Sequence, residues 1–65
     1  MSMKFFIETL ESIVKSFAED NTEGSYYQAK QVVRQTFAMT RLPVTENQIT
    51  QFVNRVWDKT HMEVA

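Results

Sequence analysis

The sequence has no cysteine and a single histidine, His61. The lack of cysteine excludes disulfide bridges and thiolate metal sites, and one histidine excludes a histidine-based metal cluster within one chain. A chain of 65 residues buries only about 60% of the surface that its unfolded form exposes, so its own core gives marginal stability. Small chains without these elements rely on regular helix packing or on oligomerisation. Because neither cysteine nor histidine can form a metal site here, we expect no metal or other cofactor.

Glycine and proline are also scarce, with one residue of each, Gly24 and Pro43. Small all-β domains need many turn residues, so this scarcity argues against them and favours long regular helices. The hydrophobic fraction of 43% is close to that of ordinary globular proteins, which argues against disorder. The sequence therefore predicts one all-α domain that spans residues 1–65.

Long apolar runs are missing as well. Charged residues interrupt the N-terminal segment at Lys4, Glu8 and Glu11, so this segment is too polar for a signal peptide. No stretch approaches the roughly 20 apolar residues that a membrane-spanning helix needs. We therefore expect a cytoplasmic protein that does not enter a membrane.

Apolar residues recur at helical spacing in three segments, which predicts helices over residues 3–18, 26–40 and 45–61. The third segment has the clearest pattern, with apolar residues at i, i+3, i+4, i+7 and i+8 starting from Ile49. Residues 62–65 have no such periodicity, so we expect them to fray.

Polar residues mark the start of each predicted helix. Ser2 is the expected N-cap of the first helix, because its hydroxyl can accept a hydrogen bond from a free backbone N–H. The pairs Ser25–Gln28 and Thr45–Gln48 have the spacing of capping boxes for the second and third helices.

The apolar faces of the predicted helices supply a common core. We expect it to contain Phe6, Leu10, Ile13, Phe17, Val33, Phe37, Ile49, Phe52, Val53 and Val56. Short connections between helices of similar length favour an antiparallel three-helix bundle. A helix-turn-helix-like arrangement is the lesser alternative, because the short link around Pro43 could set the second and third helices across each other.

The sequence contains no recognisable catalytic set. A nucleophile needs a base and a group that orients the base, and the sole histidine lies near the C-terminal end of the last predicted helix. Trp57 precedes His61 by one helical turn, so we expect a stacked or solvated histidine ring. The acidic segment around Asp20 lacks the alternating oxygen ligands of a calcium loop, and a single glycine excludes a glycine-rich phosphate loop. We therefore predict that the protein is not an enzyme.

Charge is distributed unevenly, with −3 over residues 1–24 and +2 over residues 25–65. The polar face of the third predicted helix carries amide and guanidinium groups, which can read adenine and guanine edges in the major groove. Basic residues of the second helix could contact phosphates. The candidate nucleic-acid contacts are Lys30, Arg34, Arg41, Asn47, Gln48, Gln51, Asn54, Arg55 and Lys59.

Residues 45–57, TENQITQFVNRVW, resemble the recognition helix of homeodomains, with a T-E-x-Q start, a following aromatic residue and then Asn-Arg. The resemblance implies a helix that contacts DNA. Two features differ from the homeodomain pattern. The pair Asn54-Arg55 comes one position early relative to Phe52, and the basic arm and the basic run after the helix are missing. A DNA-binding regulator that uses this helix is therefore the alternative function.

Three large aromatic residues fall outside the centre of the apolar stripes. Phe5 and Tyr27 lie on otherwise polar helix faces, and Trp57 lies at the edge of its stripe. Large exposed rings on a small chain are typical of a protein interface. Our first functional prediction is therefore a small helical interaction module, a regulator, adaptor or inhibitor, that binds another protein and acts as a homodimer.

Overall fold

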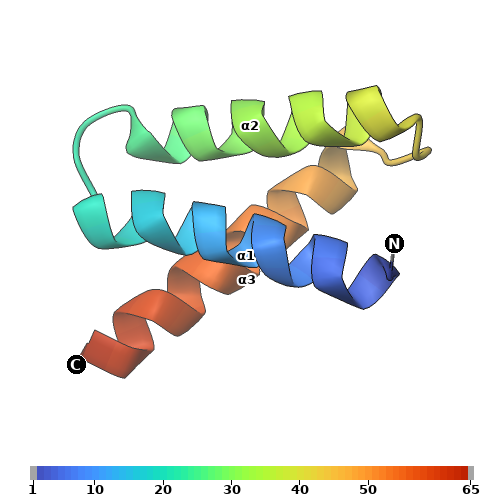
Figure 1. The fold of residues 1–65 in the computed structure, drawn as a ribbon. Coiled ribbons are helices and arrows are strands. Elements are labelled where there is room, and N and C mark those ends of the chain that lie inside the picture. Colours follow the sequence, from blue (N-terminus) through green and yellow to red (C-terminus); the bar gives the residue numbers. More distant parts are fainter. Residues whose placement is uncertain (1, 65) are drawn as a thin grey trace.

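The computed structural model describes the backbone of residues 2–64 and the side chains of residues 2–62. It contains the helices α1 (Met3–Asp20), α2 (Ser25–Thr40) and α3 (Glu46–Val64). Figure 1 shows α1 and α2 side by side in opposite directions, while α3 returns behind them on an oblique course. Every pair of helices is in contact. The predicted three-helix bundle is confirmed. The oblique course of α3 relative to α2 is a feature that this bundle shares with the helix-turn-helix-like arrangement.

Each helix begins within one residue of its predicted start, and α1 and α3 extend beyond their predicted ends. The first helix continues to Asp20 because Asn21 takes a left-handed conformation, with φ of +46°, and its N–H donates to the carbonyl of Phe17. The third helix continues to Val64, three residues past His61. Fraying of the C-terminal residues stays a prediction, and residue 65 lies outside the described residues.

Side-chain caps form at two helix starts as predicted. The Ser2 hydroxyl accepts a hydrogen bond from the N–H of Phe5. At the start of α3 the capping box is complete, because the N–H of Gln48 donates to Thr45 Oγ1 at 3.1 Å and the N–H of Thr45 donates to Gln48 Oε1 at 2.9 Å. The start of α3 is therefore determined by residues that are close in sequence.

The capping box predicted for α2 is wrong. Gly24 is the N-cap, with φ of +87°, and it has no side chain to bond a free N–H. Ser25 lies inside the helix, is 2% exposed, and its Oγ has no hydrogen-bond partner among the described residues. The reason is the backbone conformation at position 24. Its φ is positive, which glycine adopts without strain, so Gly24 takes the cap position and Ser25 is the first residue of the helix.

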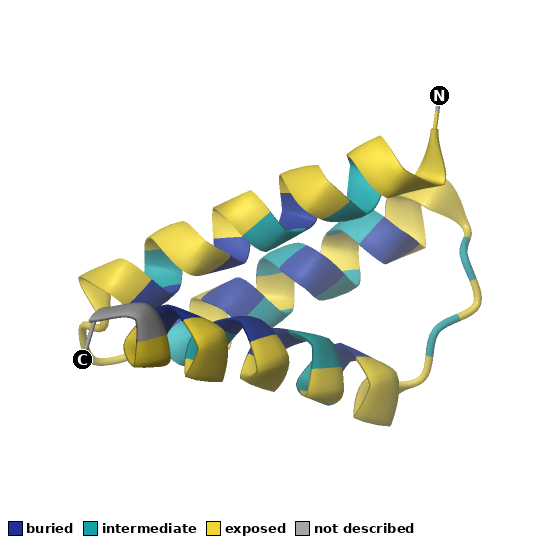
Figure 2. Ribbon diagram, turned by 90° about the horizontal axis from the view of Figure 1, so that it is seen from below, coloured by how far each residue is buried: buried dark blue, intermediate teal, exposed yellow. Residues whose placement is uncertain are grey.

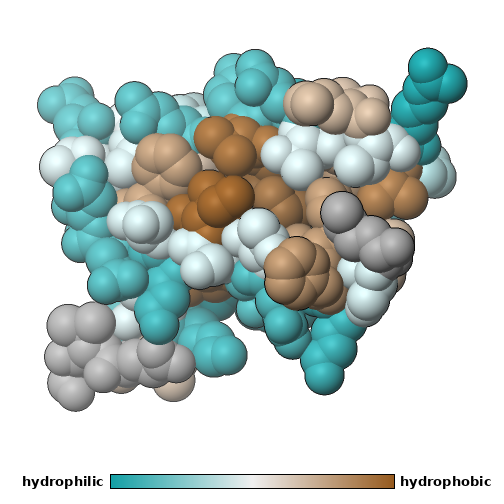
Figure 3. Space-filling view, viewed as in Figure 1, coloured by the Kyte–Doolittle hydropathy of each residue, from teal (hydrophilic) through white to brown (hydrophobic). Residues whose placement is uncertain are grey.

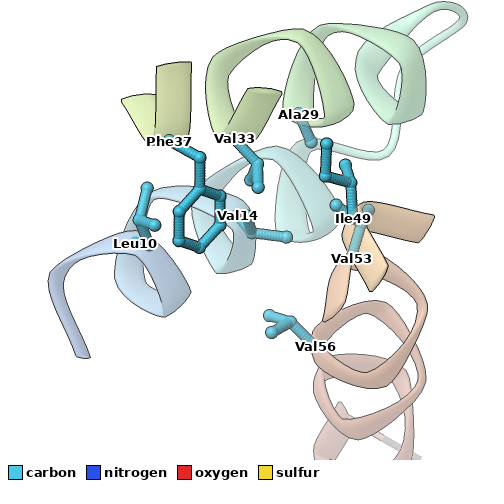
Figure 4. Packing of buried hydrophobic residues seen from close by; sticks show 8 residues of the cluster. All are labelled: Leu10, Val14, Ala29, Val33, Phe37, Ile49, Val53 and Val56. Carbon is cyan, nitrogen blue, oxygen red and sulfur yellow. The ribbon is translucent and has the colours of Figure 1, made fainter. Parts of the chain in front are cut away.

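Buried residues form one stripe on each helix, and the three stripes face one another (Figure 2). Hydrophobic residues also reach the surface between α1 and α2 (Figure 3). The buried core comprises Leu10, Val14, Ala29, Val33, Phe37, Ile49, Val53 and Val56. In Figure 4 the ring of Phe37 reaches from α2 toward Leu10 and Val14 of α1. The core therefore joins all three helices.

One predicted core residue is wrong and three are only half-buried. Ile13 is 37% exposed, although it belongs to the same apolar stripe as Leu10, which is 2% exposed. Phe6, Phe17 and Phe52 are partly buried and pack against the core. The stripe of α1 is wider than the surface that α2 and α3 cover, so its margin stays in contact with solvent.

Candidate functional site

Aromatic residues gather around Tyr26, in the first turn of α2. Its ring meets Trp57 of α3 edge to face at a centroid distance of 5.3 Å, and Tyr27 at 6.1 Å. The Tyr26 hydroxyl donates a hydrogen bond to Oδ1 of Asn54, which fixes the phenol against α3. The ammonium group of Lys30 lies 5.8 Å from the centre of the same ring. These contacts form a polar and aromatic joint between α2 and α3.

His61 extends this joint to the end of α1. Its exposed ring lies edge to face with Trp57 at a centroid distance of 6.1 Å, so the two rings meet, but in a T-shaped contact and not stacked. Its Nε2 lies 3.2 Å from the carbonyl oxygen of Ala18, and a carbonyl can only accept, so Nε2 carries the proton. Ala18 belongs to the last turn of α1, where carbonyls lack partners within the helix. Sequence reasoning missed this contact because the two residues are 43 positions apart.

The three predicted interface residues do not form one patch. Tyr27 is 74% exposed and lies beside the joint that contains the half-buried Trp57. Phe5 is 63% exposed in the first turn of α1. Because α1 and α2 are antiparallel, their first turns lie at opposite ends of the molecule (Figure 1). Any interface that uses Phe5 is therefore separate from one that uses Tyr27.

Two of the basic residues predicted to contact phosphates bind a carboxylate of the same chain. Arg34 forms a two-point pair with Glu46, the first residue of α3, in which Nε donates to Oε2 at 3.1 Å and Nη2 pairs with Oε1. Lys30 Nζ lies 3.9 Å from the same Oε1. Arg41, the third basic residue of this segment, caps α2 in a left-handed conformation with φ of +59°. The three basic residues therefore do not form one free surface for phosphates, because two pair with Glu46 and the third lies at the end of α2.

The ion pair shifts the protonation of both partners. The hydrogen bond from Arg34 is the main reason that the pKa of the Glu46 carboxyl lies below its ordinary value. The same hydrogen bond raises the pKa of Arg34. Glu46 is also in the first turn of α3, where a negative charge interacts favourably with the helix dipole. The pair therefore links α2 to the start of α3.

The polar residues of α3 divide into two groups. Gln48 belongs to the capping box and Asn54 accepts from Tyr26, so both interact within the chain. The other predicted contacts on α3 are exposed, and their side chains form no hydrogen bond or ion pair within the described part of the chain: Asn47, Gln51, Arg55 and Lys59. Only this second group is available as it stands for contact with another molecule.

Hydrophobic residues reach the surface between α1 and α2, on the side opposite α3 (Figure 3). Ile13 contributes to it and lines a shallow hollow of about 750 Å³ together with Ser12, Ser16 and Phe17. The acidic residues Glu19 and Asp20 line one end of this hollow. Sequence reasoning assigned Ile13 to the core and so missed this surface. The width of the apolar stripe of α1 was the feature of the sequence that could have indicated this exposed surface.

Among the described residues, no group of three or more His, Asp or Glu side chains is arranged to hold a metal ion. None of the described helices is long and apolar enough to cross a membrane.

No protein-family model matches the chain, and searches of curated proteins and of solved structures likewise found no match. A functional conclusion therefore rests on the surfaces described above.

Proposed function

We propose that this chain is a non-enzymatic protein-interaction module that associates with a second copy of itself. The observation that carries the proposal is the apolar surface between α1 and α2, where Ile13 is 37% exposed and Val32 is half-buried. A chain of 65 residues without cysteine gains stability when a second copy covers such a surface, at about 25 cal/mol per Å² before the costs of association. The cytoplasmic location expected from the sequence stays a prediction.

Sedimentation velocity of the native chain across micromolar to millimolar concentrations tests this proposal. We expect the mass to rise from that of the 7.7 kDa chain to twice this value as concentration increases. Helical circular dichroism recorded on the same samples checks that the chain is folded. A folded protein that sediments at 7.7 kDa up to about 1 mM, where binding amounts to only about 4 kcal/mol, would remove self-association from the proposal.

A DNA-binding regulator remains the second candidate because Gln51, Arg55 and Lys59 are exposed on α3 and uncommitted among the described residues. Three structural features make it the weaker one. Asn54 bonds to Tyr26, while Lys30 and Arg34 pair with Glu46. A protein that reads DNA needs free basic groups for phosphates as well as free groups for bases.

Binding to a library of random DNA duplexes, measured at two salt concentrations, distinguishes the two candidates. The interaction-module proposal predicts no sequence preference and no binding tighter than about 10⁻⁶ M at physiological salt, which is the non-specific range. Enrichment of one sequence would favour the DNA-binding candidate. Changing Gln51 or Arg55 to alanine should then alter that enriched sequence, whereas Gln35→Ala, at an exposed position of α2 outside the candidate contacts, serves as the matched control.

A further inference from the structure

We infer that the end of the molecule at which α1 begins and α2 ends binds an acidic amphipathic segment of another protein. This end has exposed apolar side chains beside a hollow, and the charged residues next to the hollow are basic. The inference goes beyond the self-association proposed above, because it concerns a different surface and a different partner.

The hollow at this end joins two helices. It has a volume of about 220 Å³ and is lined by Ser2, Met3 and Phe6 at the start of α1 and by Thr40 and Leu42 at the end of α2. These segments meet because α1 and α2 are antiparallel, so the start of one lies beside the end of the other (Figure 1). Phe6 and Leu42 are half-buried and pack against the core. A large apolar side chain of a partner can therefore reach the edge of the core through this hollow.

Large apolar side chains are exposed beside the hollow. Phe5 precedes Phe6 and is 63% exposed, and Met39 precedes Thr40 and is 84% exposed. Met3, which lines the hollow itself, is 56% exposed. Methionine side chains are flexible and adapt to partners of different shape, so they are frequent at surfaces that bind other proteins. These three exposed residues supply an apolar rim for a partner segment.

The charged residues of this end are basic. Residues 2–7 and 35–45 contain Lys4 and Arg41 and no aspartate or glutamate. Each of the two basic residues is next in sequence to a residue that lines the hollow. Neither forms an ion pair with another residue in the described part of the chain.

The acidic residues that follow these segments do not neutralise this end. Glu8 comes one turn after Lys4 and lines a different hollow, between α1 and α3. Glu46 pairs with Arg34. Lys4 and Arg41 are therefore available for carboxylates of a partner. Charge complementarity identifies that partner as acidic, and the hollow and its rim require that it also carries apolar side chains.

The same features argue against two other occupants. A second copy of the chain, placed end to end by a two-fold axis, would bring basic residues against basic residues. An anionic lipid surface would attract the basic residues, but it offers no anchor side chain for the hollow. A protein segment can fill the hollow with one anchor and place carboxylates on either side of it.

Selection from a library of random peptides tests the inference on the full chain. Peptides of about 16 residues, which is long enough for about four helical turns, are displayed on phage and selected on the immobilised native protein. We expect the enriched peptides to be negatively charged and to contain at least one large apolar residue. Enriched peptides without acidic residues, or no enrichment at all, would overturn the inference.

Two double variants locate the binding site. Lys4→Glu with Arg41→Asn removes the basic charge, and both changes suit the backbone, because glutamate is favourable at the start of a helix and asparagine tolerates the left-handed conformation of position 41. Phe5→Ser with Met39→Ser removes only exposed apolar side chains. We expect each double variant to bind an enriched synthetic peptide at least about tenfold more weakly than the native chain, measured by fluorescence anisotropy.

Matched controls are available on α3. Arg55→Glu with Lys59→Asn makes the same change in net charge, and Met62→Ser removes a side chain that is 76% exposed. Each control should change the peptide affinity by less than about threefold, and circular dichroism melts check that every variant is folded. Peptides that lose as much affinity for the controls as for the double variants would bind elsewhere and would overturn the inference.

Vesicle binding and sedimentation distinguish the other occupants. Tighter binding to vesicles of phosphatidylcholine with about 30% phosphatidylglycerol than to any selected peptide would assign this end to a membrane surface and overturn the inference. Sedimentation of the Phe5→Ser, Met39→Ser variant should match that of the native chain. Loss of a native dimer in this variant would show that this end is the self-association surface, in which case the inference is wrong but the proposed function stands.

Discussion

Arg34 and Glu46 join the middle of α2 to the first residue of α3 through a two-point ion pair. The guanidinium group presents two N–H donors in one plane, which matches the two oxygens of a carboxylate. This pair removes a basic residue from the surface expected to contact nucleic acid. It also makes the start of α3 sensitive to the protonation of a single carboxyl group.

The first prediction concerns acid unfolding. The pKa of Glu46 is lower in the folded chain than its ordinary value of 4.5, so the ionised pair stabilises the fold above that value. This stabilisation is lost as pH falls through the folded pKa of Glu46, while Arg34 stays protonated throughout. We expect Glu46→Gln to reduce the free energy of unfolding near neutral pH and to have progressively less effect as the solution becomes acidic. Urea unfolding at a series of pH values measures this.

Asp58→Asn serves as the control for that series, because Asp58 is exposed and has no ion pair among the described residues. Its effect should be small at every pH. A Glu46→Gln profile parallel to that of the native protein would show that the ion pair does not contribute to the acid sensitivity.

The second prediction compares two residues of similar size. Leu10 is 2% exposed in the centre of the core, whereas Met39 is 84% exposed on α2. Leu10→Ala should lower the free energy of unfolding by about 2–5 kcal/mol, because it leaves a cavity between three helices. Met39→Ala should change it by less than about 0.5 kcal/mol. Thermal melts followed by circular dichroism measure both, and equal effects would contradict the core described above.

The third prediction compares the two sites at which a capping box was expected. Thr45→Ala should destabilise the chain by about 0.5–2 kcal/mol, because the N–H of Gln48 loses its acceptor. Ser25→Ala should be neutral or stabilising, because the buried Ser25 Oγ has no partner among the described residues. A large loss of stability on Ser25→Ala would show that its hydroxyl does cap α2.

The fourth prediction concerns the turn before α2. Gly24 has φ of +87°, and a Cβ added there would meet nothing within 4 Å. The effect of Gly24→Ala is therefore backbone strain without any clash, and we expect a loss of about 1–2 kcal/mol. Gly24→Asn should lose less, because asparagine tolerates the left-handed region better than alanine does. Equal losses for the two variants would point to a cause other than backbone strain.

The helices and the polar starts of α1 and α3 could be predicted because their causes are local. Thr45 and Gln48 bond across three positions, and Ser2 bonds to the N–H of Phe5 at the same spacing. The aromatic contact between Trp57 and His61 was also predictable, since these residues lie one turn apart on one helix. Each of these interactions involves side chains that any helix brings together, whatever it packs against.

The candidate site could not be predicted in the same way. The sequence grouped Phe5 with Tyr27, but the antiparallel course of α1 and α2 places them at opposite ends. It grouped Lys30 and Arg34 with the surface, but Glu46 from the next helix reaches both. Periodicity assigns a residue to a face of its own helix and does not indicate which other helix lies opposite.

The sequence by itself determined where the helices lie, which residues cap α1 and α3 and which broad stripe of each helix is apolar, because these properties depend on neighbours within about four positions. Only the tertiary structure decided how much of each stripe is covered. Leu10 and Ile13 belong to the same apolar stripe in the sequence, yet Leu10 is 2% exposed and Ile13 is 37% exposed. In a bundle of three helices each helix has two neighbours, so one margin of a wide stripe stays open, and its position depends on where the third helix packs.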